Sequence, residues 1–178
     1  GVEKLFEQQR LTEAVPLSER VSGDTSVGHS LAYCQAVETL QGVEVSPRAR
    51  YLRTLFLELE RLHNHIGDVG AICNDTAYAL AHAHCGRMKE QLMQLNDRLT
   101  GSRFLRGVNC VGGVALDLSG LQLAQVEVEL NTLEQDFSAI EKIVFANASL
   151  TERLENTGIL TEGIAWDHAV IGVVGRAS

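Results

Sequence analysis

Ionisable side chains recur between positions 58 and 75 at the spacing of one helix face. The row consists of Glu58, Arg61, His65, Asp68, Ile72 and Asp75. Residues three or four apart on a helix lie on the same side, so neighbouring members can pair. A buried row would have shifted pKa values and could relay protons, whereas an exposed row is a solvated surface with weak ion pairs. Pattern alone favours the solvated face but leaves both interpretations open.

Histidines and cysteines do not occur at the spacings of a metal site. The pairs His63/His65 and His82/His84 are two residues apart, and such residues on a helix point to roughly opposite sides. The cysteines lack CxxC spacing, which is typical of buried apolar side chains. They are Cys34, Cys73, Cys85 and Cys110. We therefore expect no metal ligands in this chain, and no phosphate-binding glycine motif is present.

Long helices must position these residues. Apolar positions recur every three or four residues over most of the chain, and Ser46-Pro47 combines an N-cap serine with a proline at the first helical position. The pattern predicts a mainly α fold, a helical bundle of about four long helices within a single domain, 1–178. The expected elements are helices over 2–10, 25–40, 47–75, 77–100, 119–156 (the longest) and 162–169, with a glycine-rich loop or short β-hairpin near 102–118.

Composition excludes several classes of function. The 178 residues carry a net charge of −8 without a basic cluster, so we expect no binding to nucleic acid. No run of 18 apolar residues occurs, so no transmembrane segment is expected.

The segment Arg20-Val-Ser-Gly-Asp-Thr-Ser-Val-Gly-His29 resembles a metal-binding motif without its ligands. In the large subunit of nickel–iron hydrogenases the corresponding segment reads Arg-x-Cys-Gly-x-Cys-x-x-x-His. Ser22 and Thr25 stand where that family has thiolates, and a hydroxyl is a poor ligand for a soft metal. The resemblance thus implies that the scaffold is retained without nickel–iron ligands, and an active hydrogenase is disfavoured.

Further motifs follow in the family's order. They are His29-Ser-Leu-Ala-Tyr-Cys-Gln-Ala-Val-Glu38, Ser46-Pro-Arg-Ala49, Glu58-Leu-Glu-Arg-Leu-His-Asn-His65, Leu99-Thr-Gly-Ser-Arg103, Gly112-Gly-Val114 and Gly172-Val-Val-Gly-Arg-Ala-Ser178. The set resembles the superfamily that joins hydrogenase large subunits of the hydrogenase-4 and formate hydrogenlyase type with the 49-kDa quinone-site subunit of complex I. The resemblance implies a fragment of that large-subunit fold lacking both ends.

In the complex I branch, four functional positions can be compared with this chain. Asp75 matches an aspartate that partners the quinone-site histidine, and Arg20 matches an arginine beside the terminal iron–sulfur cluster. Gly23 replaces the quinone-site tyrosine, and Leu105 replaces the histidine beside the cluster. Two positions are kept and two are changed.

The resemblance implies one subunit of a membrane-associated oxidoreductase complex of the NADH:quinone type rather than an active hydrogenase. Asp75, His65 and Glu58 would form a proton path or quinone-like cavity, while Arg20 and His29 would lie near a partner's iron–sulfur cluster or mark a vestigial metal site. No cofactor is expected within the fragment, although quinone is a candidate ligand. The implied partners are an iron–sulfur small subunit and membrane-arm subunits, on the cytoplasmic side of the inner membrane. The alternative is a redox-silent structural subunit that holds its neighbours together.

Overall fold

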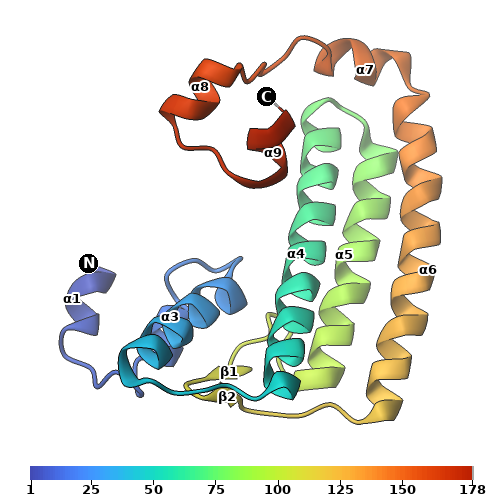
Figure 1. Ribbon diagram of the computed structural model, residues 1–178. Coiled ribbons are helices and arrows are strands. Elements are labelled where there is room, and N and C mark those ends of the chain that lie inside the picture. The colour runs from blue at the N-terminus through green and yellow to red at the C-terminus, as the bar shows by residue number, and fades with distance from the viewer. Residues whose placement is uncertain (178) are drawn as a thin grey trace.

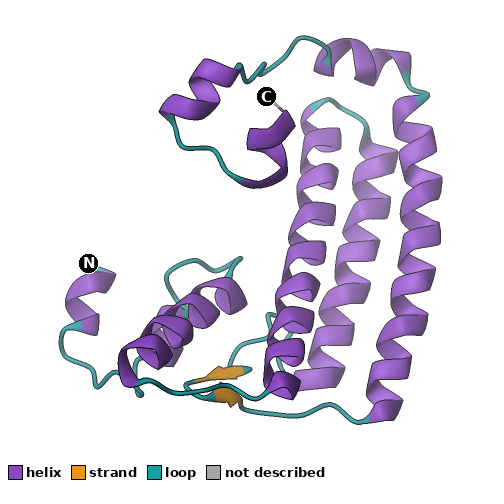
Figure 2. Ribbon diagram, viewed as in Figure 1, coloured by secondary structure: helices purple, strands orange, loops and turns teal. Residues whose placement is uncertain are grey.

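The computed structural model describes residues 1–177, which form nine helices and one two-stranded antiparallel sheet (Figures 1 and 2). The expected mainly α fold is confirmed. The helices are α1 (Val2–Phe6), α2 (Val15–Ser18), α3 (Ser26–Gln41), α4 (Pro47–Asp75), α5 (Ala79–Thr100), α6 (Gly120–Phe145), α7 (Ala148–Leu154), α8 (Glu162–Asp167) and α9 (Gly172–Ala177). The strands are β1 (Asn109–Cys110) and β2 (Gly113–Val114).

Helix α4 begins where the sequence predicts and is the longest described helix, with 29 residues. The Ser46 hydroxyl accepts a hydrogen bond from the Ala49 N–H, and Pro47 occupies the first turn. Apolar side chains at seven-residue intervals then form a buried seam along α4. They are Leu52, Leu59, Ile66 and Cys73.

Three long helices lie side by side, with α5 between α4 and α6 (Figure 1). The main core fills their interfaces with residues such as Phe56, Met88 and Leu95. Helix α6 contributes a narrow seam of three buried residues, Val126, Leu133 and Ile140. Helix α3 lies beside the sheet near the N-terminal end of α4 and contacts both. Among the described residues, no helix has both the length and the apolar composition needed to cross a membrane.

Two helix predictions need correction. The helix expected over 119–156 is broken into α6 and α7, because Asn147 leaves the helical conformation and its side chain caps α7 at the Leu150 N–H. The first helix ends at Phe6 rather than near position 10. The structure also adds two short helices, α2 and α9, that were not expected.

A buried ion pair fastens the hairpin to α3 and α4. Arg53 of α4 donates to both carboxylate oxygens of Glu38 of α3, at 2.5 and 3.0 Å. Its remaining bonds go to the carbonyl oxygens of Cys110 and Gly113, at 2.7 and 3.0 Å. Glu38 accepts a further hydrogen bond from the Gly112 N–H, and the Arg53 hydrogen bonds hold the pKa of Glu38 below its usual range. Hence one guanidinium ties three segments together.

We expect Arg53→Met to lower the free energy of unfolding by about 3 kcal/mol, because it leaves the Glu38 carboxylate and two loop carbonyls buried without their donor. Denaturant titration of the purified protein measures this loss. The control is Arg61→Met, also on α4, which removes an exposed pair with Glu58 and should cost less than about 1 kcal/mol. Equal losses for the two variants would contradict the claim that Arg53 holds the hairpin to α3 and α4.

Candidate functional site

The turn that carries Arg20 to Thr25 ends at the N-terminus of α3, and a carboxylate from α4 caps that helix. Thr25 occupies the N-cap position but makes no side-chain cap hydrogen bond. Instead, Glu60 accepts from the Val27 N–H at 2.6 Å and the Gly28 N–H at 2.9 Å. A carboxylate is well placed there because helix N-terminal N–H groups lack intrahelical acceptors and carry the positive end of the helix dipole.

Burial dominates the electrostatics of Glu60. Only 3% of the residue is exposed, and this desolvation raises the pKa of its carboxyl above 4.5. The two N–H hydrogen bonds and the nearby His29 oppose that rise by favouring the anion. Half-buried His29 therefore lies within electrostatic reach of the cap at the start of α3.

Two further contacts hold the 20–25 turn in place. The Asn64 side chain of α4 donates to the Asp24 carbonyl oxygen at 2.6 Å. Just before the turn, the buried Glu19 carboxylate accepts from the Gly107 N–H at 2.6 Å, joining it to the loop that precedes β1. Burial raises the pKa of Glu19, while this hydrogen bond and the nearby Arg106 act in the opposite direction. The turn is thus seated between α4 and the 102–108 loop.

The donor set of the seated turn does not fit a nickel–iron centre. The hydroxyls of Ser22 and Thr25 are hard, weakly acidic ligands. Within residues 1–177, no group of three or more His, Cys, Asp or Glu side chains is arranged to hold a metal ion. Arg20 is exposed and Ser22 is partly buried.

The row of ionisable residues lies on the exposed face of α4. Glu58 and Arg61 pair at 3.1 Å, each about half exposed, and His65, Asp68 and Asp75 are also exposed. This placement corresponds to the solvated face and not to a buried relay within the described chain. We call these residues, with Ile72, the polar row.

The polar row and the seated turn come together at Asn64. Asn64, which holds Asp24, is three residues after Arg61 and four before Asp68, so it lies beside both on the helix surface. Asp75 is the last residue of α4. At a rise of ~1.5 Å per residue, it lies roughly 16 Å from Asn64 along the helix axis. The structure thus places Arg20 in the seated turn and His29 in the first turn of α3, while Glu58 and His65 lie on the exposed face of α4 and Asp75 lies at its far end.

Sequence reasoning missed the buried polar residues that hold the turn and the hairpin in place. Glu60 and Arg53 are seven residues apart, and each directly follows a leucine of the buried seam, Leu59 and Leu52. Polar residues that repeat beside a buried seam are a signal for buried hydrogen bonding, because burying them without partners is costly. Their partners on α3 could not be read from the spacing.

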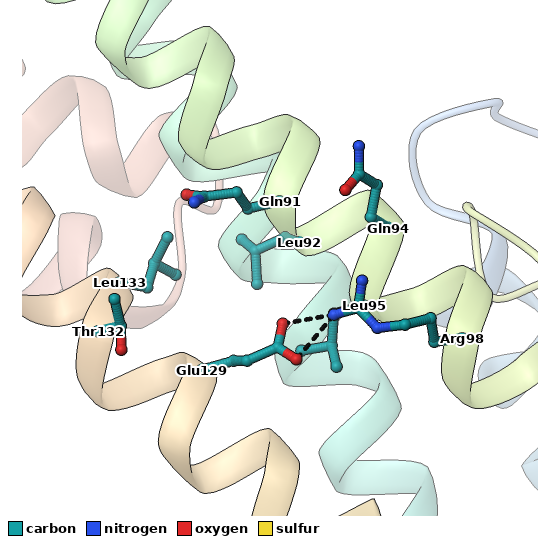
Figure 3. A pocket seen from close by; sticks show the side chains of 8 residues that line it. All are labelled: Gln91, Leu92, Gln94, Leu95, Arg98, Glu129, Thr132 and Leu133. Atoms are coloured by element: carbon teal, nitrogen blue, oxygen red, sulfur yellow. Dashed lines mark hydrogen bonds and ion pairs between the residues drawn. The ribbon is translucent and has the colours of Figure 1, made fainter.

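A groove of about 280 Å³ lies elsewhere, between α5 and α6 (Figure 3). Its central charges are Arg98 and Glu129, which bind one another at 2.6 Å. No predicted site residue lines this groove. We therefore place the candidate site at the seated turn and the polar row.

We expect Glu60→Ala to destabilise the protein by about 2 kcal/mol, because the N–H groups of Val27 and Gly28 would lose their acceptor in a buried setting. Chemical denaturation measures this change, and Glu60→Gln should cost less because it keeps one acceptor oxygen. The matched control is Glu58→Ala, on the exposed face two residues away, which should change stability by no more than about 0.5 kcal/mol. If the two alanine variants were equally stable, the cap would not be holding α3.

Known proteins resemble the chain along nearly its whole length. Residues 68–178 match the family described as the 49-kDa subunit of respiratory-chain NADH dehydrogenase. Hydrogenase-4 component G of Escherichia coli (strain K12) is 34% identical over 168 residues, which is 94% of this chain and 30% of that protein. One of the NADH-quinone oxidoreductase subunits of Clostridium beijerinckii is 29% identical across 100% of this chain and 48% of that protein.

The fold itself recurs in a solved complex. A chain of the membrane-bound sulfane sulfur reductase, an archaeal respiratory membrane complex, superposes with a TM-score of 0.90 at 27% identity, covering 98% of this chain and 47% of that one. The chain thus spans between about a third and a half of the length of these relatives.

Proposed function

The chain belongs to the family of the 49-kDa subunit of respiratory-chain NADH dehydrogenase, and we propose that it serves in the large subunit of a membrane-associated electron-transfer complex. The observation that carries this proposal is the seated turn. Glu60 and Asn64 hold a segment with the family's Arg20…His29 spacing against α4, although its thiolate positions are hydroxyls. The relatives named above belong, by name, to hydrogenase and NADH-quinone oxidoreductase assemblies, which supports the assignment to such a complex.

The chemistry we propose is of the NADH:quinone type and not hydrogen activation. Ser22 and Thr25 offer no sulfur to a nickel–iron centre, so we derive no step through such a centre. Quinone remains a candidate ligand at a cavity that the polar row would line with other parts of the complex. The chain's own contribution there would be to hold or pass protons.

Asp75 is the member of the polar row that we assign the main proton role. Its carboxylate ends α4 and is exposed, so it is accessible to solvent or to another subunit for proton exchange. His65 and Glu58 would continue the path along the same face.

The proposed partners follow from what the exposed surfaces carry. Arg20 is exposed on the seated turn and His29 lies half buried beside it, so this end of the molecule would face a small subunit with an iron–sulfur cluster. The polar row would face subunits of the membrane arm. We place the assembly on the cytoplasmic side of the inner membrane, as a peripheral part.

One observation favours a redox-silent structural subunit as the second candidate. Leu105 stands where the resemblance places the histidine beside a partner's cluster, and Leu105 is fully buried. No imidazole is available at that point, and Gly23 likewise supplies no tyrosine hydroxyl. A scaffold that had lost these groups would still hold its neighbours together.

In the intact complex, we expect Asp75→Asn to lower electron-transfer turnover by about a hundredfold, because an amide cannot exchange the proton. Turnover with the complex's own donor and a soluble quinone is the measurement. Asp97→Asn, at an exposed aspartate of α5, is the control and should leave turnover unchanged.

Full turnover in the Asp75→Asn complex would remove Asp75 from the mechanism. A different outcome is that the unmodified complex shows no quinone-linked turnover. In that case the structural-subunit candidate would replace the proposal. Subunit composition should be checked in each variant, so that a loss of assembly is not mistaken for a loss of chemistry.

A further inference from the structure

His63 is a fully buried imidazole without a hydrogen-bond partner. Only 1% of the residue is exposed, and among the described residues neither ring nitrogen makes a hydrogen bond of good geometry. A neutral imidazole always carries one N–H and one acceptor nitrogen, so a buried ring without partners is costly. Such a group calls for a physical explanation.

The loop over 102–107 covers His63 on one side. The Phe104 ring meets the imidazole edge to face, with centroids 6.4 Å apart, and Arg106 lies over the Phe104 ring at 5.6 Å. The next residue in the loop, Leu105, is fully buried in a left-handed backbone conformation at φ 54°, which a non-glycine residue adopts only at a cost. The loop is therefore closed but strained.

The closed loop is held at its far end by Glu19, through the bond to the Gly107 N–H. Arg103 is drawn outward to Glu90 of α5, at 2.6 and 3.0 Å. The loop is thus held by these two charged contacts, by the Asn96 side chain, which donates to the Arg103 carbonyl oxygen at 3.2 Å, and by Leu105 in the main core, whereas its contact with the His63 ring is the aromatic one of Phe104.

Positive charge near His63 opposes its protonation in the closed state. Lys89 of α5 packs against Gly67, which lies one helical turn after His63 on α4. A Cβ placed on Gly67 would be 3.0 Å from the Lys89 Nζ. Burial first, and Lys89 second, lower the pKa of His63 below its ordinary value of 6.5. The Leu59 carbonyl and Asp24 act in the opposite direction but do not reverse the shift.

We propose that the 102–107 loop is a proton-sensitive flap, closed over neutral His63 and released when that imidazole takes up a proton. An imidazolium has two N–H donors, and the Leu59 carbonyl beside it in the closed site is not placed for a hydrogen bond of good geometry, whereas in the open state both donors reach water. The inference concerns the loop alone and does not depend on the electron-transfer function proposed above.

The direction of the pH dependence follows from the lowered pKa. The open state binds the proton near pH 6.5 and the closed state only at lower pH, so the flap is most stable above 6.5 and weakens as the pH falls below that value. Glu19 and Glu60 have raised pKa values and contribute with the opposite sign. A comparison with a His63 variant separates the contribution of the imidazole from theirs.

Amide hydrogen exchange in the full-length protein tests the flap. The amides of Leu105, Arg106 and Gly107 all donate hydrogen bonds in the closed loop. After correction for intrinsic exchange rates, we expect their protection to fall between roughly pH 7.5 and 5.5, by at most about tenfold, which is the limit for one proton taken up with a pKa of ~6.5 in the open state. His63→Phe should abolish this fall, and Lys89→Met should reduce it.

His65→Phe is the matched control, because His65 lies two residues further along α4 and is exposed. It should leave the fall unchanged. If His63→Phe disturbs packing, two other measurements decide whether protonation of His63 causes the fall. They are hydrogen exchange in His63→Gln and NMR titration of the His63 ring in the unmodified protein. An equal fall in the His63 variant, or a ring that titrates at or above pH 6.5, would overturn the proposal.

Discussion

The carboxylate of Glu60 beneath α3 is the contact on which the candidate site depends. Helix α3 starts without a side-chain cap of its own, so its first free N–H groups require an acceptor from elsewhere. Glu60 supplies that acceptor from α4 at 2.6 and 2.9 Å, across more than thirty residues of sequence. Because one carboxylate fixes both the start of α3 and the end of the 20–25 turn, the position of Arg20 and His29 follows from α4.

The same logic extends to the other buried polar contacts. Arg53, Glu38 and Glu19 each join segments far apart in sequence, and each makes hydrogen bonds that would be costly to leave unmade. The interior therefore specifies one arrangement of α3, the hairpin and the seated turn (Figure 1). In contrast, the polar row on α4 makes only the exposed Glu58–Arg61 pair in the described chain, and so remains available to solvent or to other parts of a complex.

Local signals in the sequence were sufficient to predict where most of the helices begin and end. Ser46 and Ser119 both cap the helices that their patterns indicate, and Gly101 ends α5 in the left-handed conformation. Asn147 was missed because the apolar period continues across it and hides a new cap. The seat of the turn was not predictable, since helical spacing tells which residues share a face but not which distant N–H group Glu60 will meet. The roles of Asp75, His65, Glu58, Arg20 and His29 stay predictions.

The metal and quinone content of the purified complex shows whether this chain keeps the large-subunit scaffold without its nickel–iron ligands. Elemental analysis and solvent extraction of the complex from its native host supply both values. We expect bound quinone and no nickel. Nickel at one atom per complex, with no other subunit able to hold it, would contradict the assignment of Ser22 and Thr25, and absence of both would favour a structural subunit.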